Sequence, residues 1–443
     1  MSNSLPPTPG VLASPSVAAH NPLPPGMRDV LPPKARFQSR VGARIMKSFE
    51  LFGYARVWLP TFEYAEVLER TPSGGGALRF VEPESGEVVA LRADMTPQVA
   101  RVVSTRYRTQ PLPVRLCYQG SVLRRRRERA RTESQVVQAG IELVGSSGLE
   151  ADFEVLAALS AAVKAAGLRR FVISIGHAGI PDALLRGVAS AERSAVGEAL
   201  AAKDTLVLSH LAQRLGLGRQ AALALVGLAE LHGGPEVYEP AARLLRGTSA
   251  ESAGLQLRAL CERVVAAGLA PNVIIDFGET SRRDYYTGPL FQVLAEGPGE
   301  ALASGGRYDH LYPRYGLERE AAGCALDVNN VCWALDAEGF VEPEFPKVVL
   351  PRSASYELLM ALRSEQTVCA VAEGAAADYA KSWGWDFWLE AETTPRIVAQ
   401  GGESRTLSAT SPSEQAREIL AFLRSVREER ASGALTKAAN RGS

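Results

Sequence analysis

Apolar residues recur along the chain at helical and strand periods, which predicts a protein with both helices and strands. Between residues 35 and 52 they recur at three- and four-residue steps with Arg and Lys between them, as in an amphipathic helix. These residues are Phe37, Val41, Ile45, Phe49 and Phe52. Short apolar runs predict strands at 55–60, 88–92, 114–118, 171–177 and 273–277. Residues 179–268 show only helical stripes and no chemical motif.

The same patterns divide the chain into domains. A stretch rich in Pro, Ser and Ala opens the chain, without the basic start and apolar core of a signal peptide. A Pro-rich linker at 342–346 precedes a mixture of short strands and helices. We therefore expect a disordered tail (1–25), a core domain (26–178 and 270–338), a helical insertion (179–269), a small α/β domain (346–430) and a flexible tail (431–443).

Composition narrows the classes of function. The 443 residues carry 49 Lys and Arg against 49 Asp and Glu, so the net charge is zero. This balance argues against a protein whose main task is to hold a polyanion. The five cysteines are dispersed without a Cys-x-x-Cys pair, which favours reduced thiols in the cytoplasm over a zinc site or disulfides. No apolar run reaches the roughly 18 residues that span a bilayer.

Two segments have the composition of a ligand pocket. Residues 284–288 are Asp-Tyr-Tyr-Thr-Gly, and residues 305–309 are Gly-Gly-Arg-Tyr-Asp. Glycine lets a ligand approach the backbone, tyrosine supplies a flat apolar wall with a hydroxyl at its rim, and Arg or Asp fixes a charged group. A Gly-rich β-hairpin with a Tyr-rich face explains the same pattern equally well.

These two segments resemble the histidine-recognition segments of histidyl-tRNA synthetases and of their non-synthetase relatives, the regulatory subunits of short-form ATP phosphoribosyltransferase. The resemblance covers residues 22–335, and the C-terminal domain only in outline. It implies an α+β fold: a class II synthetase-like antiparallel sheet flanked by helices, a helical insertion, and a small α/β domain resembling a degenerate anticodon-binding domain. It also implies a homodimer through the core, with Trp58 and Pro60 near the interface.

Other segments are similar to the ligand-binding motifs of this family. In residues 91–96, Asp94 and Thr96 match the acid and the threonine that reach the α-ammonium of the ligand, although either one also suits the cap of the next helix. Arg124 opens a run with six arginines in residues 124–131. By position it matches the class II arginine that holds the α-phosphate of ATP, and a solvated loop is the alternative.

The strand at 138–143 is the most informative local pattern. Gln138, Gly140 and Glu142 share one face, whereas the apolar residues between them share the other. Glycine weakens a strand, so its central position favours a ligand lying over it, with Gln138 on the ammonium and Glu142 accepting an imidazole N–H. The predicted histidine-binding residues are Asp94, Thr96, Arg124, Gln138, Glu142, Tyr285, Tyr286, Gly305 and Tyr308.

The chain departs from a synthetase where adenylation needs positive charge. The third motif of the family ends in Gly-x-Glu-Arg, and the aligned residues 327–330 are Asp-Val-Asn-Asn. Arg126 replaces a glutamate that contacts adenine, and Ser281 replaces the arginine that begins the first histidine-binding segment. The ligand-holding set is kept, so we expect histidine binding with no catalytic residue, cofactor or metal.

The resemblance therefore implies a non-catalytic regulatory subunit in histidine biosynthesis. It would bind free histidine, and it would both activate a short-form catalytic subunit of ATP phosphoribosyltransferase and confer feedback control on it, with neither tRNA nor a membrane as a partner. The alternative is a divergent histidyl-tRNA synthetase, or a synthetase-like amino-acid-activating enzyme, in which the arginine run supplies the missing charge. A weaker alternative is a stand-alone histidine-binding module with another partner.

Overall fold

The computed structural model describes residues 23–24, 26–71, 77–124, 134–280, 285–342, 345–391 and 394–439. The expected N-terminal tail (nearly all of 1–25), Arg126 with the rest of the arginine run after Arg124, and Ser281 lie outside these residues. The chain forms two compact units, Met1–Phe340 and Val341–Ser443. Within the described residues, no helix combines the length and the apolar character that crossing a membrane requires.

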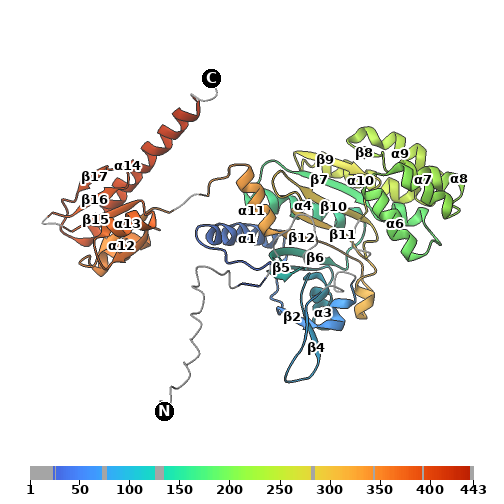
Figure 1. The fold of residues 1–443 in the computed structure, drawn as a ribbon, viewed down its shortest axis with the longest axis horizontal. Coiled ribbons are helices and arrows are strands. Elements are labelled where there is room, and N and C mark those ends of the chain that lie inside the picture. Colours follow the sequence, from blue (N-terminus) through green and yellow to red (C-terminus); the bar gives the residue numbers. More distant parts are fainter. Residues whose placement is uncertain are drawn as a thin grey trace, which may run out of the picture. The chain divides into compact units, whose positions relative to one another are not determined.

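The first unit contains most of the secondary structure (Figure 1). Its strands are β1 (Ala55–Arg56), β2 (Phe62–Tyr64), β3 (Arg79–Val81), β4 (Val88–Leu91), β5 (Val114–Leu123), β6 (Gln135–Val144), β7 (Val172–His177), β8 (His232–Gly233), β9 (Asn272–Asp276), β10 (Pro289–Leu294), β11 (Ala303–Arg307) and β12 (Ala321–Asp327). Its helices are α1 (Lys34–Leu51), α2 (Ala65–Glu69), α3 (Thr96–Arg106), α4 (Gly148–Ala166), α5 (Gly179–Leu184), α6 (Ser190–Ala201), α7 (Thr205–Arg214), α8 (Arg219–Gly227), η3 (Pro235–Val237), α9 (Tyr238–Leu245), α10 (Glu251–Ala266), η4 (Tyr312–Tyr315) and α11 (Val328–Ala337).

A nine-stranded sheet organises this unit, in the order β1-β5-β6-β12-β11-β10-β7-β9-β8. Every pairing from β5 across to β7 is antiparallel, whereas β1 pairs with β5 and β9 with β7 in parallel. The predicted antiparallel sheet flanked by helices is therefore confirmed. The strand predicted at 55–60 was too long, because only Ala55 and Arg56 pair with β5 before the chain turns away toward Pro60.

Helices α1, α4, α10 and α11 cover one face of the sheet and share a large apolar core with it. Ala139, Ile141 and Leu143 of β6 point into this core, as the alternation in the sequence predicted. The apolar stripe of α1 meets them there, with Val41, Ile45 and Phe49 all fully buried. Each such side chain contributes about 1.5–3 kcal/mol relative to remaining exposed.

A second apolar cluster lies against the opposite face of the sheet. It includes residues of α3 and η4 together with tyrosines from the two Tyr-containing segments. A small three-stranded sheet, in the order β2-β4-β3, accompanies α2 and α3. This face carries Gln138 and Glu142, so the side that the sequence predicted for the ligand is itself enclosed.

The helical insertion is continuous with the first core. Val196, Leu200 and Leu208 of α6 and α7 belong to the same apolar cluster as α1 and α4. Figure 1 shows α6 to α9 gathered beyond the β7-β9-β8 end of the sheet. Lys203, in the turn between α6 and α7, places its Nζ 2.7 Å from both carboxylate oxygens of Asp276 at the end of β9, which fastens the insertion to the sheet.

The second unit is a small α/β domain. Its sheet has the order β14-β13-β15-β16-β17. The elements are β13 (Lys347–Pro351), α12 (Tyr356–Ser364), β14 (Val368–Ala372), α13 (Ala376–Trp383), β15 (Phe387–Glu390), β16 (Arg396–Ala399), β17 (Ser404–Thr406) and α14 (Pro412–Ala439). Strands β15 and β17 were not expected. Helix α14 continues to Ala439, so helical backbone enters the range where the sequence suggested a flexible tail (431–443).

A buried ion pair joins the sheet to α4. The Nη2 of Arg307, at the end of β11, lies 2.7 Å from Oδ1 of Asp152, and both side chains are 8% exposed. The Nη1 of Arg307 also lies 3.1 Å from Oδ1 of Asp309. Arg307 thereby fixes the chain on both sides of the turn that carries Tyr308.

We expect Arg307→Met to lower the free energy of unfolding by about 3 kcal/mol or more, because it leaves the Asp152 carboxylate buried without its cation. Urea denaturation of the full chain measures this loss. The control is Arg79→Met, which removes an ion pair with Glu69 at 2.7 Å whose side chains are 48% and 38% exposed, and which should cost less than about 1 kcal/mol. Equal losses in the two variants would contradict a structural role for the buried pair.

Candidate ligand-binding site

The site is built around the carboxylate of Glu142, which lies near the C-terminal end of β6 and is 1% exposed. Its Oε1 accepts a hydrogen bond of 3.1 Å from the hydroxyl of Tyr118 on β5. Its Oε2 accepts a hydrogen bond from the hydroxyl of Tyr308, which follows β11. Two donors therefore hold a carboxylate that would otherwise be costly to bury.

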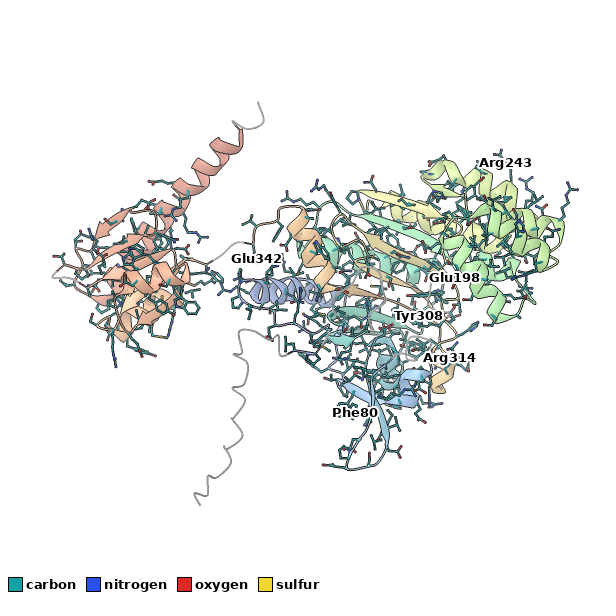
Figure 2. The ribbon with its side chains drawn as sticks, viewed as in Figure 1. Phe80, Glu198, Arg243, Tyr308, Arg314 and Glu342 are labelled. Atoms are coloured by element: carbon teal, nitrogen blue, oxygen red, sulfur yellow. The ribbon has the colours of Figure 1, made fainter. Side chains whose placement is uncertain are left out.

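Three tyrosine rings close over this carboxylate, and the sequence predicted all three as site residues. The ring of Tyr285 lies 5.1 Å from that of Tyr286 and 5.7 Å from that of Tyr308, the latter in an edge-to-face arrangement. Tyr286 and Tyr308 are 6.2 Å apart. Each of these tyrosines is less than a tenth exposed. Tyr308 is labelled in Figure 2.

A second polar group adjoins the first at the start of α3. Oδ1 of Asp94 accepts hydrogen bonds from the Nε2 of Gln138 at 3.1 Å and from the backbone N–H of Met95 at 2.8 Å. The hydroxyls of Thr96 and Tyr118 are 3.5 Å apart, so Tyr118 connects this group to Glu142. Asp94 thus contacts both the backbone before α3 and Gln138, although the N-cap position of the helix is Met95 and has no side-chain cap.

Glycines shape the surface beneath these side chains. Gly323 of β12 is paired in register with Glu142, and a Cβ there would overlap both the Tyr308 hydroxyl and the Glu142 carboxylate. Gly306 lies on the same face, where a Cβ would meet the ring of Tyr286 at 2.8 Å. Glycine at these two positions is what lets the tyrosines reach the sheet.

Two of the sequence expectations on glycine need correction. A Cβ on Gly140 would lie 2.5 Å from the hydroxyl of Tyr118, so a tyrosine of the protein, rather than a ligand, covers this glycine. Gly305 faces the other side of the sheet, with its missing side chain toward Phe291 and Cys324. Strand alternation places its neighbour Gly306 on the face of the site instead.

Arg124 lies directly after β5, and its Nε donates to the carbonyl of Ala93 at 3.3 Å. This contact places it next to Asp94, at the end of the site away from the tyrosine rings. The structure therefore brings Arg124 to the polar group at α3 and not to Glu142. The predicted residues that meet around Glu142 are Tyr285, Tyr286 and Tyr308, and those that meet at α3 are Asp94, Thr96, Arg124 and Gln138.

The residues at the third-motif positions have structural contacts. Asn330 is 6% exposed, and its Nδ2 donates to the carbonyl of Ala301 at 3.1 Å. The carboxylate of Asp327 accepts from the backbone N–H of Asn330 and so caps α11. Asn329 accepts from the side chain of Gln38 at 2.7 Å and from the backbone of Val137. None of these contacts supplies positive charge for a triphosphate.

Sequence reasoning missed two contributors, Tyr118 and Gly323. Strand β5 was predicted to end at residue 118, whereas it continues to Leu123 and pairs Tyr118 with Gly140. Had the strand been extended, a large residue opposite a glycine would have been the signal. Burial, followed by the nearby Glu142, raises the pKa of Tyr118 well above its usual range, so its hydroxyl keeps its proton and can donate.

Another acidic residue, Glu279, lies on the same face of the sheet, next to strand β7. Its side chain packs over Gly176, and its Oε1 accepts from Nε2 of Gln292 at 3.2 Å. Burial, and then the adjacent Asp276, raise the pKa of Glu279 to about 7. Within the described part of the chain, no three His, Cys, Asp or Glu side chains are grouped so as to hold a metal ion.

This architecture defines the class of the protein. A largely antiparallel sheet backed by helices, with the site on its other face, is the fold of class II histidyl-tRNA synthetase-like proteins. A profile of the histidyl-tRNA synthetase family matches residues 26–331. A solved structure from Bacillus halodurans, described as an ATP phosphoribosyltransferase regulatory subunit/histidyl-tRNA synthetase, superposes with a TM-score of 0.70 at 26% identity, covering 82% of this chain and 96% of that one.

Sequence relatives narrow the family further. A protein of Syntrophotalea carbinolica named ATP phosphoribosyltransferase regulatory subunit is 33% identical over 90% of this chain and 96% of its own length. A protein of the same name from an Anaeromyxobacter species is 40% identical over 71% of this chain and 93% of its own length. The chain belongs to the ATP phosphoribosyltransferase regulatory subunits, within the histidyl-tRNA synthetase family.

The raised pKa of Glu279 predicts how stability depends on pH. A folded-state pKa of about 7 against an ordinary value of 4.5 means that the folded protein binds this proton more tightly. Stability should therefore fall as pH rises from about 4.5 to 7, by about 2 kcal/mol after allowance for partial exposure. Urea denaturation across this range should show that Glu279→Gln removes the decline.

The matched control is Glu87→Gln on the exposed β3–β4 hairpin, whose profile should run parallel to that of the wild type. If the Glu279→Gln profile also ran parallel to the wild type, the Glu279 carboxyl would not be the group responsible for the decline.

Proposed function

We propose that this protein is a non-catalytic regulatory subunit in histidine biosynthesis that binds free histidine in the cytoplasm. It activates a short-form catalytic subunit of ATP phosphoribosyltransferase and confers feedback control on it. The proposal depends on an asymmetry between two parts of the chain. The buried carboxylates and the amide that suit an amino acid, those of Asp94, Glu142 and Gln138, lie together. At the position of the third-motif arginine, by contrast, the chain has Asn330, whose side chain donates to the carbonyl of Ala301.

The two polar groups of the site match the two ends of histidine. An α-ammonium group needs hydrogen-bond acceptors. The group at the start of α3 offers three: the carboxylate of Asp94, the amide oxygen of Gln138 and the hydroxyl of Thr96. Glu142 offers a carboxylate among aromatic rings, which suits an imidazole N–H and its flat apolar faces. Arg124, next to Asp94, is placed for the carboxylate of the ligand. Amino acids without a donor at the end of the side chain cannot donate to Glu142 and should bind less tightly than histidine.

The contacts of α11 oppose an amino-acid-activating role. Adenylation requires cations that stabilise the charge on the leaving pyrophosphate, and Asn330 instead donates to Ala301. The alternative, a divergent synthetase, depends on the arginines of residues 125–131, which lie outside the described residues. Lys and Arg from residue 346 onward number twelve, against twelve Asp and Glu, which gives the C-terminal domain little electrostatic attraction for tRNA.

We also propose that the chain forms a homodimer through its core. Trp58 follows the edge strand β1 and is 80% exposed. It borders a surface pocket of about 270 Å³ that is also lined by Arg56, Gln119 and Ser121. A large exposed aromatic residue beside a polar pocket is typical of a contact residue at a protein interface.

Calorimetric titration of the full chain with histidine tests the central proposal. We expect one histidine site per chain. We expect Glu142→Gln to weaken binding by about one to two powers of ten, because a neutral amide oxygen is a weaker acceptor for the imidazole N–H than a charged carboxylate. Glu87→Gln, on the exposed hairpin, is the control and should bind like the wild type. A wild-type protein that does not bind histidine would refute the proposal.

A second experiment separates the regulatory role from the enzymatic alternative. In the first assay, histidine-dependent exchange between ATP and pyrophosphate should be absent. In the second assay, the chain is added together with histidine to a short-form catalytic subunit, and this addition should inhibit phosphoribosyl transfer. Exchange at rates typical of synthetases would favour the divergent synthetase and overturn the regulatory interpretation of α11.

A further inference from the structure

The site around Glu142 is filled by side chains of the protein itself. Both carboxylate oxygens already accept hydrogen bonds, one from Tyr118 and one from Tyr308. The rings of Tyr285 and Tyr286 pack against that of Tyr308 at 5.7 and 6.2 Å. Glu142 is 1% exposed and lies beneath these rings, so an imidazole that donates to it needs space that one of the two tyrosines now fills.

Tyr118 is the donor that stays. It lies in the interior of β5, is fully buried, and its ring end occupies the space over Gly140 that a side chain would otherwise fill. Its hydroxyl also lies 3.5 Å from that of Thr96. The hydroxyl of Tyr118 therefore contacts both Glu142 and Thr96 while its ring end is fitted over Gly140.

Tyr308 lies just past the end of β11, where its backbone N–H donates to the carbonyl of Ala321 at 2.8 Å. Arg307 on one side is tied to Asp152, and the backbone N–H of Asp309 on the other side donates to Thr287 Oγ1 at 3.0 Å. With its two neighbours anchored, separating the Tyr308 hydroxyl from Glu142 requires a rotation of the ring about its own side-chain bonds.

We propose that Tyr308 is an internal competitor of the ligand: its hydroxyl occupies Glu142 until histidine displaces it. This deepens the proposed function, on which it rests, because it identifies the event that histidine binding triggers in the site. A protein whose binding-competent form is only a fraction of the population binds with an affinity reduced by that fraction. Tyr308 therefore sets the histidine concentration at which the site fills.

The test compares histidine titrations of the wild type, Tyr308→Phe and Tyr312→Phe. The phenyl ring of the Tyr308→Phe variant keeps the apolar packing but cannot donate to Glu142, so we expect roughly tenfold tighter binding, as for loss of one competing hydrogen bond to a charged group. Tyr312 is the matched control: it is fully buried in the same cluster, and its hydroxyl has no hydrogen-bond partner among the described residues. Tyr312→Phe should bind like the wild type.

Tighter binding in Tyr308→Phe alone supports the competitor role. Unchanged or weaker binding in Tyr308→Phe, while the wild type binds, overturns it and leaves the proposed function intact, because Tyr308 would then be an ordinary contact of the ligand. Absence of histidine binding in the wild type and in both variants refutes the proposed function itself. If Tyr308→Phe fails to fold, Tyr308→Met fills the space without a donor and gives the same comparison.

Discussion

The cost of burying one carboxylate underlies the arrangement of this site. Glu142 is buried on β6, away from water, and a buried carboxylate needs hydrogen-bond donors. Tyrosine hydroxyls from two other segments supply them. Gly323 and Gly140 follow from the same requirement, because any larger residue would occupy the space that those two tyrosines use. The turn at Arg307 and Asp309 then holds one of the donors in place.

Local sequence pattern was sufficient to predict much of the fold and to select most of the residues that lie together in the candidate site. The alternation at 138–143 predicted which side chains enter the apolar core, and the Tyr-Tyr and Gly-Gly-Arg-Tyr segments do meet over the sheet. The misses concern register between strands. The alignment of β11 with β12 determines which of Gly305 and Gly306 faces the tyrosines. The alignment of β5 with β6 places Tyr118 over Gly140. No single segment of the sequence encodes these alignments.

The contacts of α11 involve the residues that align with the third motif of the synthetases. Asn329 joins α11 to α1 and β6, and Asn330 joins it to the segment before β11. These amides contribute to packing at the place where a synthetase positions charge. Restoring a cation at residue 330 would therefore remove a buried hydrogen bond as well as add a charge. A cation at residue 330 and the present hydrogen bond to Ala301 are therefore alternatives at this position.

The shared core of the sheet and the helical insertion has a consequence for the history of this architecture. Val196, Leu200 and Leu208 lie in one apolar cluster with the side chains of α1 and α4, and Lys203 anchors the insertion to the end of β9. An ancestor that lost this segment would have uncovered part of its own interior. The sheet and the insertion therefore share one core, and a substitution in either must fit the packing of the other.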